Sequence, residues 1–268
     1  IRRWIFDTRA PRWCLYRGRL PPAIEDAAPW LLRVIPGDAR IEEFLARGWG
    51  RSWGILFTSQ APSRELRRHL RRFLRVRTAQ GRILAFRYYD PRVLRVYLPS
   101  CEPAENATFF GPITSLIAES EDGGPARVFR PANARPAPPP SLNLWTIRDE
   151  QLAAFHADLE RQLAGRAVAY LRRQYAAACA ALGDAAVIRS VETALEKRAA
   201  YRFDSEETVF AWLDLMYLLG RDFDTNPDPR FEWARERLKD FDLGARTRLL
   251  LLVEEVRADL AAAGRAAS

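Results

Sequence analysis

The sequence predicts a two-lobed protein, with an α/β lobe over residues 1–130 that holds a mixed sheet with flanking helices, and an all-α lobe over residues 145–268. Short apolar runs alternate with amphipathic stretches in the first half, as expected for strands and helices that pack in layers. The second half keeps helical spacing to its end. Five prolines within 131–140 predict a stiff, extended connector over 131–144.

Hydrophobic spacing and turn residues place the elements of the first lobe. Apolar residues at helical spacing predict helices over 22–35 and 62–76. A further helix should follow Asp90 and end near Pro99, because aspartate accepts hydrogen bonds from free N–H groups of a first helical turn, where Pro91 needs none. Continuous apolar or β-branched runs predict the strands, at 3–6, 53–58, 82–89, 109–117 and 127–129.

Capping residues and glycines divide the second lobe into five or six helices. Thr146 with Asp149, and Asp204 with Glu207, resemble capping boxes, and Asp184 is a further candidate N-cap. Glycines mark the expected breaks or ends of these helices, at Gly165, Gly183, Gly220 and Gly264.

Positive charge is concentrated in the first lobe. The 268 residues hold 42 Lys+Arg and 34 Asp+Glu, a net charge of +8. Residues 1–100 hold 21 basic and 8 acidic side chains and carry +13, so the remainder carries −5. Every cation except Lys197 and Lys239 is arginine. The first half is therefore expected to attract anionic surfaces.

Cysteine usage and hydropathy predict the compartment. Three cysteines, an odd number spread along the chain, form no disulfide framework and favour a reducing environment. No run approaches the roughly 20 apolar residues of a membrane-spanning helix, and the first residues lack the apolar core of a signal peptide. We expect a cytoplasmic protein without membrane insertion.

The sequence patterns of common phosphate-binding and zinc sites are missing. The chain contains no G-x-G-x-x-G or G-x-x-x-x-G-K-[ST] cradle for phosphates. Residues 50–54 (GRSWG) have the G-x-S-x-G spacing of a nucleophile elbow, but Ser52 is interpreted as a residue that leads into the strand predicted over 53–58. The two histidines, His69 and His156, leave few ligands for zinc. We expect no enzyme activity, no metal and no cofactor.

Residues 222–228 carry oxygen ligands at alternate positions, as a calcium loop does. Such a loop needs Gly at its sixth position and Glu at its twelfth, where this chain has Pro227 and Trp233. The favoured interpretation is an interhelical turn in which Asp and Asn act as caps.

The predicted helix over 62–76 is dense in arginine. Leu66 and Leu70 share its apolar face, and arginines occupy the rest. We predict that this surface meets a partner through Arg64, Arg67, Arg68, Arg71 and Arg75. A contact with the acidic second lobe and a merely solvated face are the alternatives. His69 lies on the same helix and is predicted to be a surface or boundary residue rather than a catalytic one.

Four sequence blocks occur in order between residues 53 and 113: Trp53-Gly54-Ile55, then LRRHLRRFL at 66–74, RYYDPRVL at 87–94 and FFGPI at 109–113. In combination they resemble the type VI secretion effector adaptor-chaperone family, the Tap/Tec adaptors. Residues 219–224 (LGRDFD) are similar to a turn in that family's helical lobe.

The resemblance implies a non-enzymatic protein whose partners are a cognate secreted effector and the VgrG spike onto which the effector is loaded, with no nucleic acid expected. We expect the motif residues to hold the fold rather than touch a partner: Trp53, Gly54, His69, Arg87, Tyr89, Asp90, Pro91, Arg92, Phe110, Gly111, Pro112, Phe223 and Asp224. Two other classes stay open. One is an Arg-rich nucleic-acid-binding protein, and the other is a hydrolase that uses Ser52, His69 and Asp90.

Overall fold

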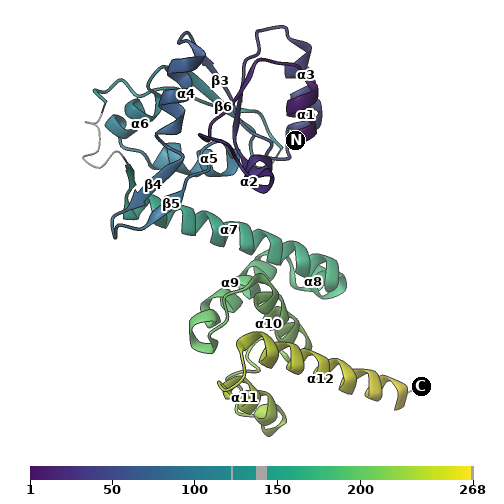
Figure 1. The fold of residues 1–268 in the computed structure, drawn as a ribbon. Helices are drawn as coiled ribbons and strands as arrows, with labels where there is room; N and C mark the ends of the chain where they lie inside the picture. The colour runs from purple at the N-terminus through teal and green to yellow at the C-terminus, as the bar shows by residue number, and fades with distance from the viewer. Residues whose placement is uncertain (122, 137–143, 267–268) are drawn as a thin grey trace. The chain divides into compact units, whose positions relative to one another are not determined.

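The chain divides into two compact units, Ile1–Asp158 and Leu159–Ser268. The computed structural model describes residues 1–121, 123–136 and 144–266. The first unit combines small sheets with helices and the second is all helical (Figure 1), which confirms the predicted fold class. Within the described residues, no helix combines the length and apolar character needed to cross a membrane.

The strands of the first unit form three small sheets rather than one. β3 (Leu56–Ser59), β6 (Ile113–Ala118) and β7 (Arg127–Phe129) are antiparallel, with β6 in the centre. β4 (Arg75–Thr78) pairs antiparallel with β5 (Ile83–Ala85) and parallel with β8 (Trp145–Ile147). A separate antiparallel pair joins β1 (Arg12–Cys14) to β2 (Trp30–Leu32).

Six α-helices accompany these sheets in the described part of the first unit: α1 (Arg2–Asp7), α2 (Pro22–Ala27), α3 (Ala39–Gly48), α4 (Ser63–Arg71), α5 (Pro91–Ser100) and α6 (Pro103–Phe110). Their main core is aromatic. The ring of Phe109 contacts those of Phe73 and Tyr97 edge to face. Phe73 contacts Trp145 in the same way, and Tyr97 contacts Phe86, so that the ring centroids of the four pairs are 4.8–5.6 Å apart. Such contacts add to the stabilisation that burial provides.

β8 lies beyond the predicted connector and yet belongs to the sheet of β4. Trp145 is buried in the first unit's core and donates a hydrogen bond from Nε1 to the Tyr97 hydroxyl at 2.8 Å. Helical structure therefore begins at Asp149 rather than directly after Trp145. Residues 137–143 of the predicted connector lie outside the described residues, as does Asp122, which lies between the strands predicted over 109–117 and 127–129.

Four sequence-based assignments were wrong in type or extent. Residues 3–6 are part of α1 and not a strand, since a short apolar run does not distinguish the two structures. The helix expected over 22–35 stops at Ala27, because Pro29 forces Ala28 into an extended conformation, and β2 follows. The helix expected over 62–76 ends at Arg71. Phe109 and Phe110 end α6 instead of opening a strand.

Two other strands are shorter than expected, and several elements were missed. β3 begins at Leu56 rather than at residue 53, and β5 covers three residues of the predicted 82–89. No element was predicted at β1, α3 or β8, nor over residues 103–108 of α6. α5 and β7, by contrast, lie where they were predicted.

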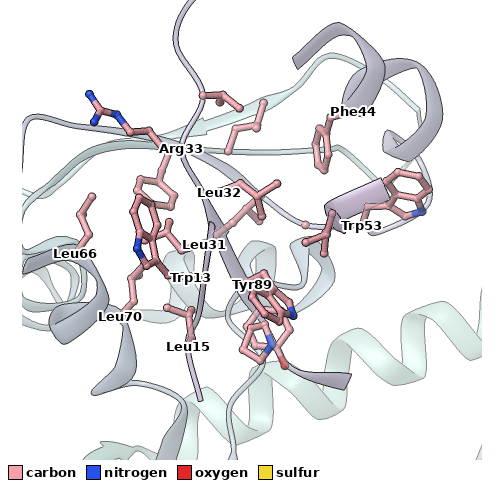
Figure 2. A pocket seen from close by; sticks show the side chains of 18 of the residues that line it. Trp13, Leu15, Leu31, Leu32, Arg33, Phe44, Trp53, Leu66, Leu70 and Tyr89 are labelled. Atoms are coloured by element: carbon pink, nitrogen blue, oxygen red, sulfur yellow. The ribbon is translucent and has the colours of Figure 1, made fainter. Parts of the chain in front are cut away.

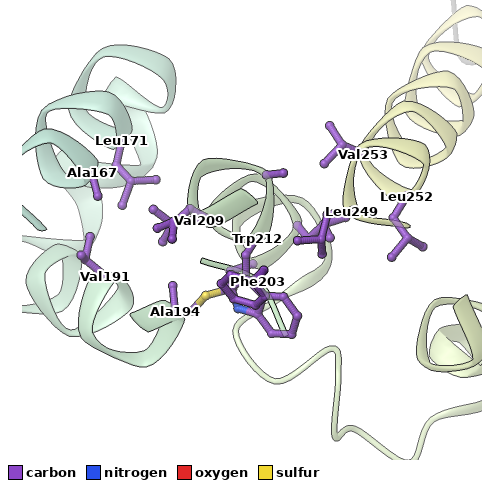
Figure 3. Close-up of a cluster of buried hydrophobic side chains, with 14 of the residues drawn as sticks. Ala167, Leu171, Val191, Ala194, Phe203, Val209, Trp212, Leu249, Leu252 and Val253 are labelled. Carbon is purple, nitrogen blue, oxygen red and sulfur yellow. The ribbon is translucent and has the colours of Figure 1, made fainter. Parts of the chain in front are cut away.

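The second unit is built around α10 (Glu206–Leu219), which packs against α9 (Asp184–Tyr201) and α12 (Ala245–Ala266). Figure 3 shows Trp212 and Val209 of α10 among side chains from α9 and α12. The other helices of its described part are α7 (Asp149–Gln174), α8 (Ala176–Leu182), the short 3₁₀ helix η1 (Pro229–Phe231) and α11 (Glu232–Lys239).

Helix ends in this unit follow the predicted residues only in part. Gly183 and Gly220 end α8 and α10 with positive φ, as expected, while Gly165 and Gly264 lie inside helices. α10 is capped by Ser205 with Thr208, one residue beyond the predicted Asp204 and Glu207. Ahead of α7 the amide of Arg148 donates to the Gln151 side chain, while Thr146 lies in β8.

Residues 222–228 form the predicted interhelical turn. Asn226 accepts a hydrogen bond from the amide of Asp228, and Asp228 caps η1 by accepting from the amide of Arg230 at 2.9 Å. Among the described residues, no group of three His, Cys, Asp or Glu side chains is placed to hold a metal ion.

Candidate partner-binding site

Helix α4 turns its leucines inward and most of its arginines toward solvent. Leu66 and Leu70 are 8% and 5% exposed, whereas Arg64 and Arg68 are exposed and Arg67 is half-buried. Within the part of the chain that the structure describes, none of these arginines forms an ion pair. Like charges one turn apart oppose a helix unless they are compensated. The exposed face of α4 is therefore suited to an acidic partner.

Arg71 has a different role from the other arginines of α4. Its guanidinium donates hydrogen bonds to the carbonyl oxygens of Leu15 at 2.8 Å, Cys14 at 3.0 Å and Tyr16 at 3.3 Å. Partial burial and the positive charges of Arg67 and Arg17 lower the pKa of Arg71. Arg71 thus ties α4 to the end of β1.

Arg75 does not belong to the helix at all, because it is the first residue of β4. The structure therefore divides the predicted set of five arginines. Arg64, Arg67 and Arg68 share α4 as unpaired cations, Arg71 is bonded to backbone, and Arg75 is exposed on a strand.

Asp90 caps α5 as the sequence predicted. Its carboxylate is 5% exposed and accepts hydrogen bonds from the backbone N–H and the guanidinium of Arg92 at 2.7–3.0 Å, while Arg87 forms a longer ion pair at 3.7 Å. Burial alone would raise the pKa of Asp90, but the hydrogen bonds from Arg92 outweigh it and hold the pKa below its ordinary value. Pro91 occupies the first helical position.

Asp90→Ala should destabilise the first unit by about 1–2 kcal/mol, because α5 loses its N-cap and Arg92 its partner. Urea unfolding followed by tryptophan fluorescence measures the loss. Since the pKa of Asp90 is lowered in the folded state, its charge stabilises the fold above the ordinary Asp pKa of about 3.9, and this stabilisation disappears as the pH falls below that value.

The stability difference between the parent protein and Asp90→Asn should therefore shrink in acid. If Asp90→Ala melts at the same temperature as the parent protein but no longer binds the partner protein, Asp90 is a contact residue instead.

His69 and the carbonyl oxygen of Phe109 form a buried contact. His69 is 8% exposed, and its Nε2 lies 2.7 Å from the carbonyl oxygen of Phe109. A carbonyl oxygen can only accept, so Nε2 carries the proton. Burial lowers the pKa of His69. The histidine is thus a neutral, bonded residue of the core, deeper than the predicted surface or boundary position.

The three residues of the hydrolase hypothesis make their hydrogen bonds to other groups. Ser52 donates to Glu119 at 3.1 Å, His69 bonds to the backbone at Phe109, and Asp90 holds Arg92. A nucleophile and its base must lie within hydrogen-bonding reach of each other. The structure does not bring these side chains together as such a set.

Glu119 is a structural residue that the sequence analysis did not single out. It follows β6, is 5% exposed, and accepts hydrogen bonds from the backbone N–H groups of Gly50 at 2.6 Å and Ser52 at 2.9 Å. Gly50 and Ser52 have φ values of +76° and +53°, so Glu119 holds an unusual turn. That turn leads directly to Trp53, which packs on Trp4 and Phe44.

A cavity of about 880 Å³ lies in the first unit. Apolar side chains from the first three helices, from β1–β3 and from α4 line it. In Figure 2, Leu66 and Leu70 approach Trp13 on one side of the cavity, and Phe44 and Trp53 lie on the other. Volumes of 300–1,000 Å³ with mostly apolar walls are typical of binding sites.

The remaining motif residues are mostly structural. Gly54 and Tyr89 line the cavity, Phe110 is fully buried, and the carbonyl oxygen of Pro112 accepts a hydrogen bond from Ser59 at 2.6 Å. In the second unit, the rings of Phe223 and Trp212 pack 5.2 Å apart. Buried Asp224 accepts hydrogen bonds there from two side chains, Lys197 at 2.5 Å and Tyr201 at 3.0 Å.

The first unit is thus an α/β domain that combines an apolar cavity with a helix of unpaired arginines. Residues 3–108 match the model of a family described as "Domain of unknown function (DUF4123)". This family is associated with adaptors of type VI secretion effectors and is not known as an enzyme family. The match runs from α1 into α6. No curated protein and no solved structure matches the chain.

Proposed function

We propose that this protein is a non-enzymatic adaptor that binds a cognate type VI secretion effector in the cytoplasm of the producing cell and loads it onto the VgrG spike. The match of residues 3–108 to a family associated with such adaptors carries this proposal. The unpaired arginines and the apolar cavity of the first unit support it, because both favour a protein partner with acidic and apolar residues.

Co-purification with the toxin encoded beside this gene tests the proposal. A tagged copy of the full chain is co-expressed with that toxin and with the VgrG spike, and the purified material is separated by size-exclusion chromatography. We expect the toxin to elute with the adaptor and the spike to join this complex. A toxin that elutes separately from the chain would contradict the adaptor function.

The double variant Arg64→Glu/Arg68→Glu should associate with the toxin about tenfold more slowly at low salt, because exposed charges mainly steer encounter. Its melting temperature should equal the parent's, since neither arginine has a partner to lose. Stopped-flow fluorescence or biolayer interferometry at several salt concentrations measures the rate. Arg19→Glu/Arg82→Glu is the matched control, because it makes the same change of charge at exposed residues outside α4.

Unchanged binding and unchanged stability of the Arg64→Glu/Arg68→Glu variant would show that the arginine face of α4 is solvated surface. The same variant addresses the nucleic-acid alternative, which the charge of the first hundred residues favours. In that case the parent should retard a duplex DNA or RNA probe with steep salt dependence, and the variant should not. The adaptor function instead requires the toxin complex to survive nuclease treatment.

A further inference from the structure

The walls of the cavity include two strands that each lack a partner on one side. Among the described residues, β2 pairs with β1 alone and β3 pairs with β6 alone. Residues 26–36 and 51–57 line the cavity without a gap. Successive side chains of a strand point to opposite faces, so a cavity on one face would meet every second residue. Because every residue of 26–36 lines the cavity, the cavity runs along the edge of β2 and not over one of its faces.

The hydrogen bonds between β1 and β2 show which backbone groups that edge offers. Leu15 donates to the carbonyl oxygen of Pro29, and Arg33 donates to that of Pro11, both at 2.9 Å. With Trp13 opposite Leu31, the odd-numbered residues of β2 bond to β1. Trp30 and Leu32 therefore direct their N–H and C=O groups to the opposite edge, where no strand of the described residues lies.

The outer edge of β1 differs, because Arg71 already occupies the carbonyl group of Cys14 there. A strand that joins this small sheet would therefore add to β2. On either side of β2 lie apolar groups: Leu31 packs into the main core, while Trp30 and Leu32 pack with Trp4 and Phe44. A segment along the β2 edge would find apolar contacts for both rows of its side chains.

Charge at the cavity indicates the polar character of such a segment. Five arginines line it, and three are in ion pairs: Arg2 with Asp26, Arg40 with Asp38 and Arg87 with Asp90. The other two, Arg33 and Arg51, are exposed and form no ion pair within the described residues. Figure 2 shows the side chain of Arg33 extending away from the apolar lining. These two guanidinium groups fit carboxylates.

We propose that an extended segment of the bound effector adds to the free edge of β2 inside this cavity, with apolar side chains in the cavity and a carboxylate against Arg33 or Arg51. This inference rests on the proposed function and names the part of the partner that is recognised. In this mode of recognition, backbone hydrogen bonds provide affinity and the pockets for alternate side chains provide specificity.

Photo-crosslinking of the adaptor–toxin complex tests where the segment lies. p-Benzoylphenylalanine is incorporated at Ile35, which lines the cavity and is 61% exposed, or at Val128 of β7, which does not line it and is 53% exposed. We expect a toxin adduct from position 35 and none from position 128, and mass spectrometry then identifies the crosslinked segment. A complex that gives no adduct from position 35 would overturn the inference and leave the adaptor function intact. Failure of the complex to form would overturn both.

Synthetic peptides of the crosslinked segment then distinguish strand addition from other modes. N-methylation of the amides that face β2 should weaken binding at least tenfold, and N-methylation of the intervening amides should not. If N-methylation at consecutive positions weakens binding, as it would for a bound helix, the inference is overturned. It is also overturned if N-methylation weakens binding at no position. Arg33→Glu/Arg51→Glu should also weaken binding at least tenfold relative to Arg19→Glu/Arg82→Glu.

Discussion

Replacing Glu119 with alanine is expected to lower the free energy of unfolding of the first unit by about 3 kcal/mol, because the turn at Gly50 and Ser52 loses its acceptor. Two backbone N–H groups and one hydroxyl donate to this carboxylate. Each would be left without a partner in a part-buried place. Urea denaturation followed by tryptophan fluorescence measures the change, since Trp53 directly follows the turn.

Two control variants separate the acceptor role of Glu119 from its charge. Glu42 is exposed on α3, and Glu42→Ala should change stability by less than about 0.5 kcal/mol. Glu119→Gln keeps the size of the side chain and one acceptor oxygen. Its loss of unfolding free energy should therefore lie between that of Glu42→Ala and that of Glu119→Ala. If Glu119→Ala is as stable as the parent protein, the turn at Gly50 and Ser52 keeps its conformation without the hydrogen bonds to Glu119.

The Glu119→Ala variant also bears on binding. A loosened turn displaces Trp53, which lines the cavity and packs on Phe44. The toxin should therefore dissociate faster from Glu119→Ala than from Glu42→Ala, because Glu42 is exposed on α3 and does not line the cavity. Comparison at a temperature where both variants remain folded removes the effect of global unfolding.

Gly111→Ala should cost about 3 kcal/mol or more, through two separate effects. Gly111 has φ +49° and ψ −114°, a conformation that strains a residue with a side chain by about 1–3 kcal/mol. An added Cβ would also lie 2.3 Å from Cε1 of His69. The imidazole cannot move away without breaking its hydrogen bond to Phe109. Thermal and urea unfolding measure the total.

A double-mutant cycle separates the two effects. In the His69→Ala background the collision is absent, so Gly111→Ala should cost only the conformational part, and the coupling should be at least about 1 kcal/mol. Gly81→Ala is the matched control, because Gly81 has φ +83° and nothing within 4 Å of its added Cβ. Equal costs in both backgrounds would contradict the proposed collision.

Several motif residues make contacts within their own unit. Asp90 caps a helix, His69 bonds to a backbone carbonyl, and Phe110 is fully buried. The two surfaces proposed for binding, the edge of β2 and the exposed face of α4, both lie in the first unit.

The sequence by itself determined features that depend on near neighbours. The order of an α/β unit and a helical unit follows from hydrophobic spacing, and the start of α5 follows from Asp90-Pro91, whose cap is completed two residues later by Arg92. Asn226 and Asp228 in the turn at 222–228 likewise accept hydrogen bonds from amides only two residues later. The unequal distribution of charge needs no structure at all.

Only the tertiary structure decided the contacts between distant residues. Arg71 differs from Arg67 and Arg68 because the carbonyl groups of Cys14 and Leu15, more than fifty residues away, meet it. Glu119 gains its role from a turn 67–69 residues earlier. Residues 3–6 form a helix because Trp4 and Ile5 pack on Phe44. Local propensity is weak compared with burial, and which surfaces are buried together is set by the whole chain.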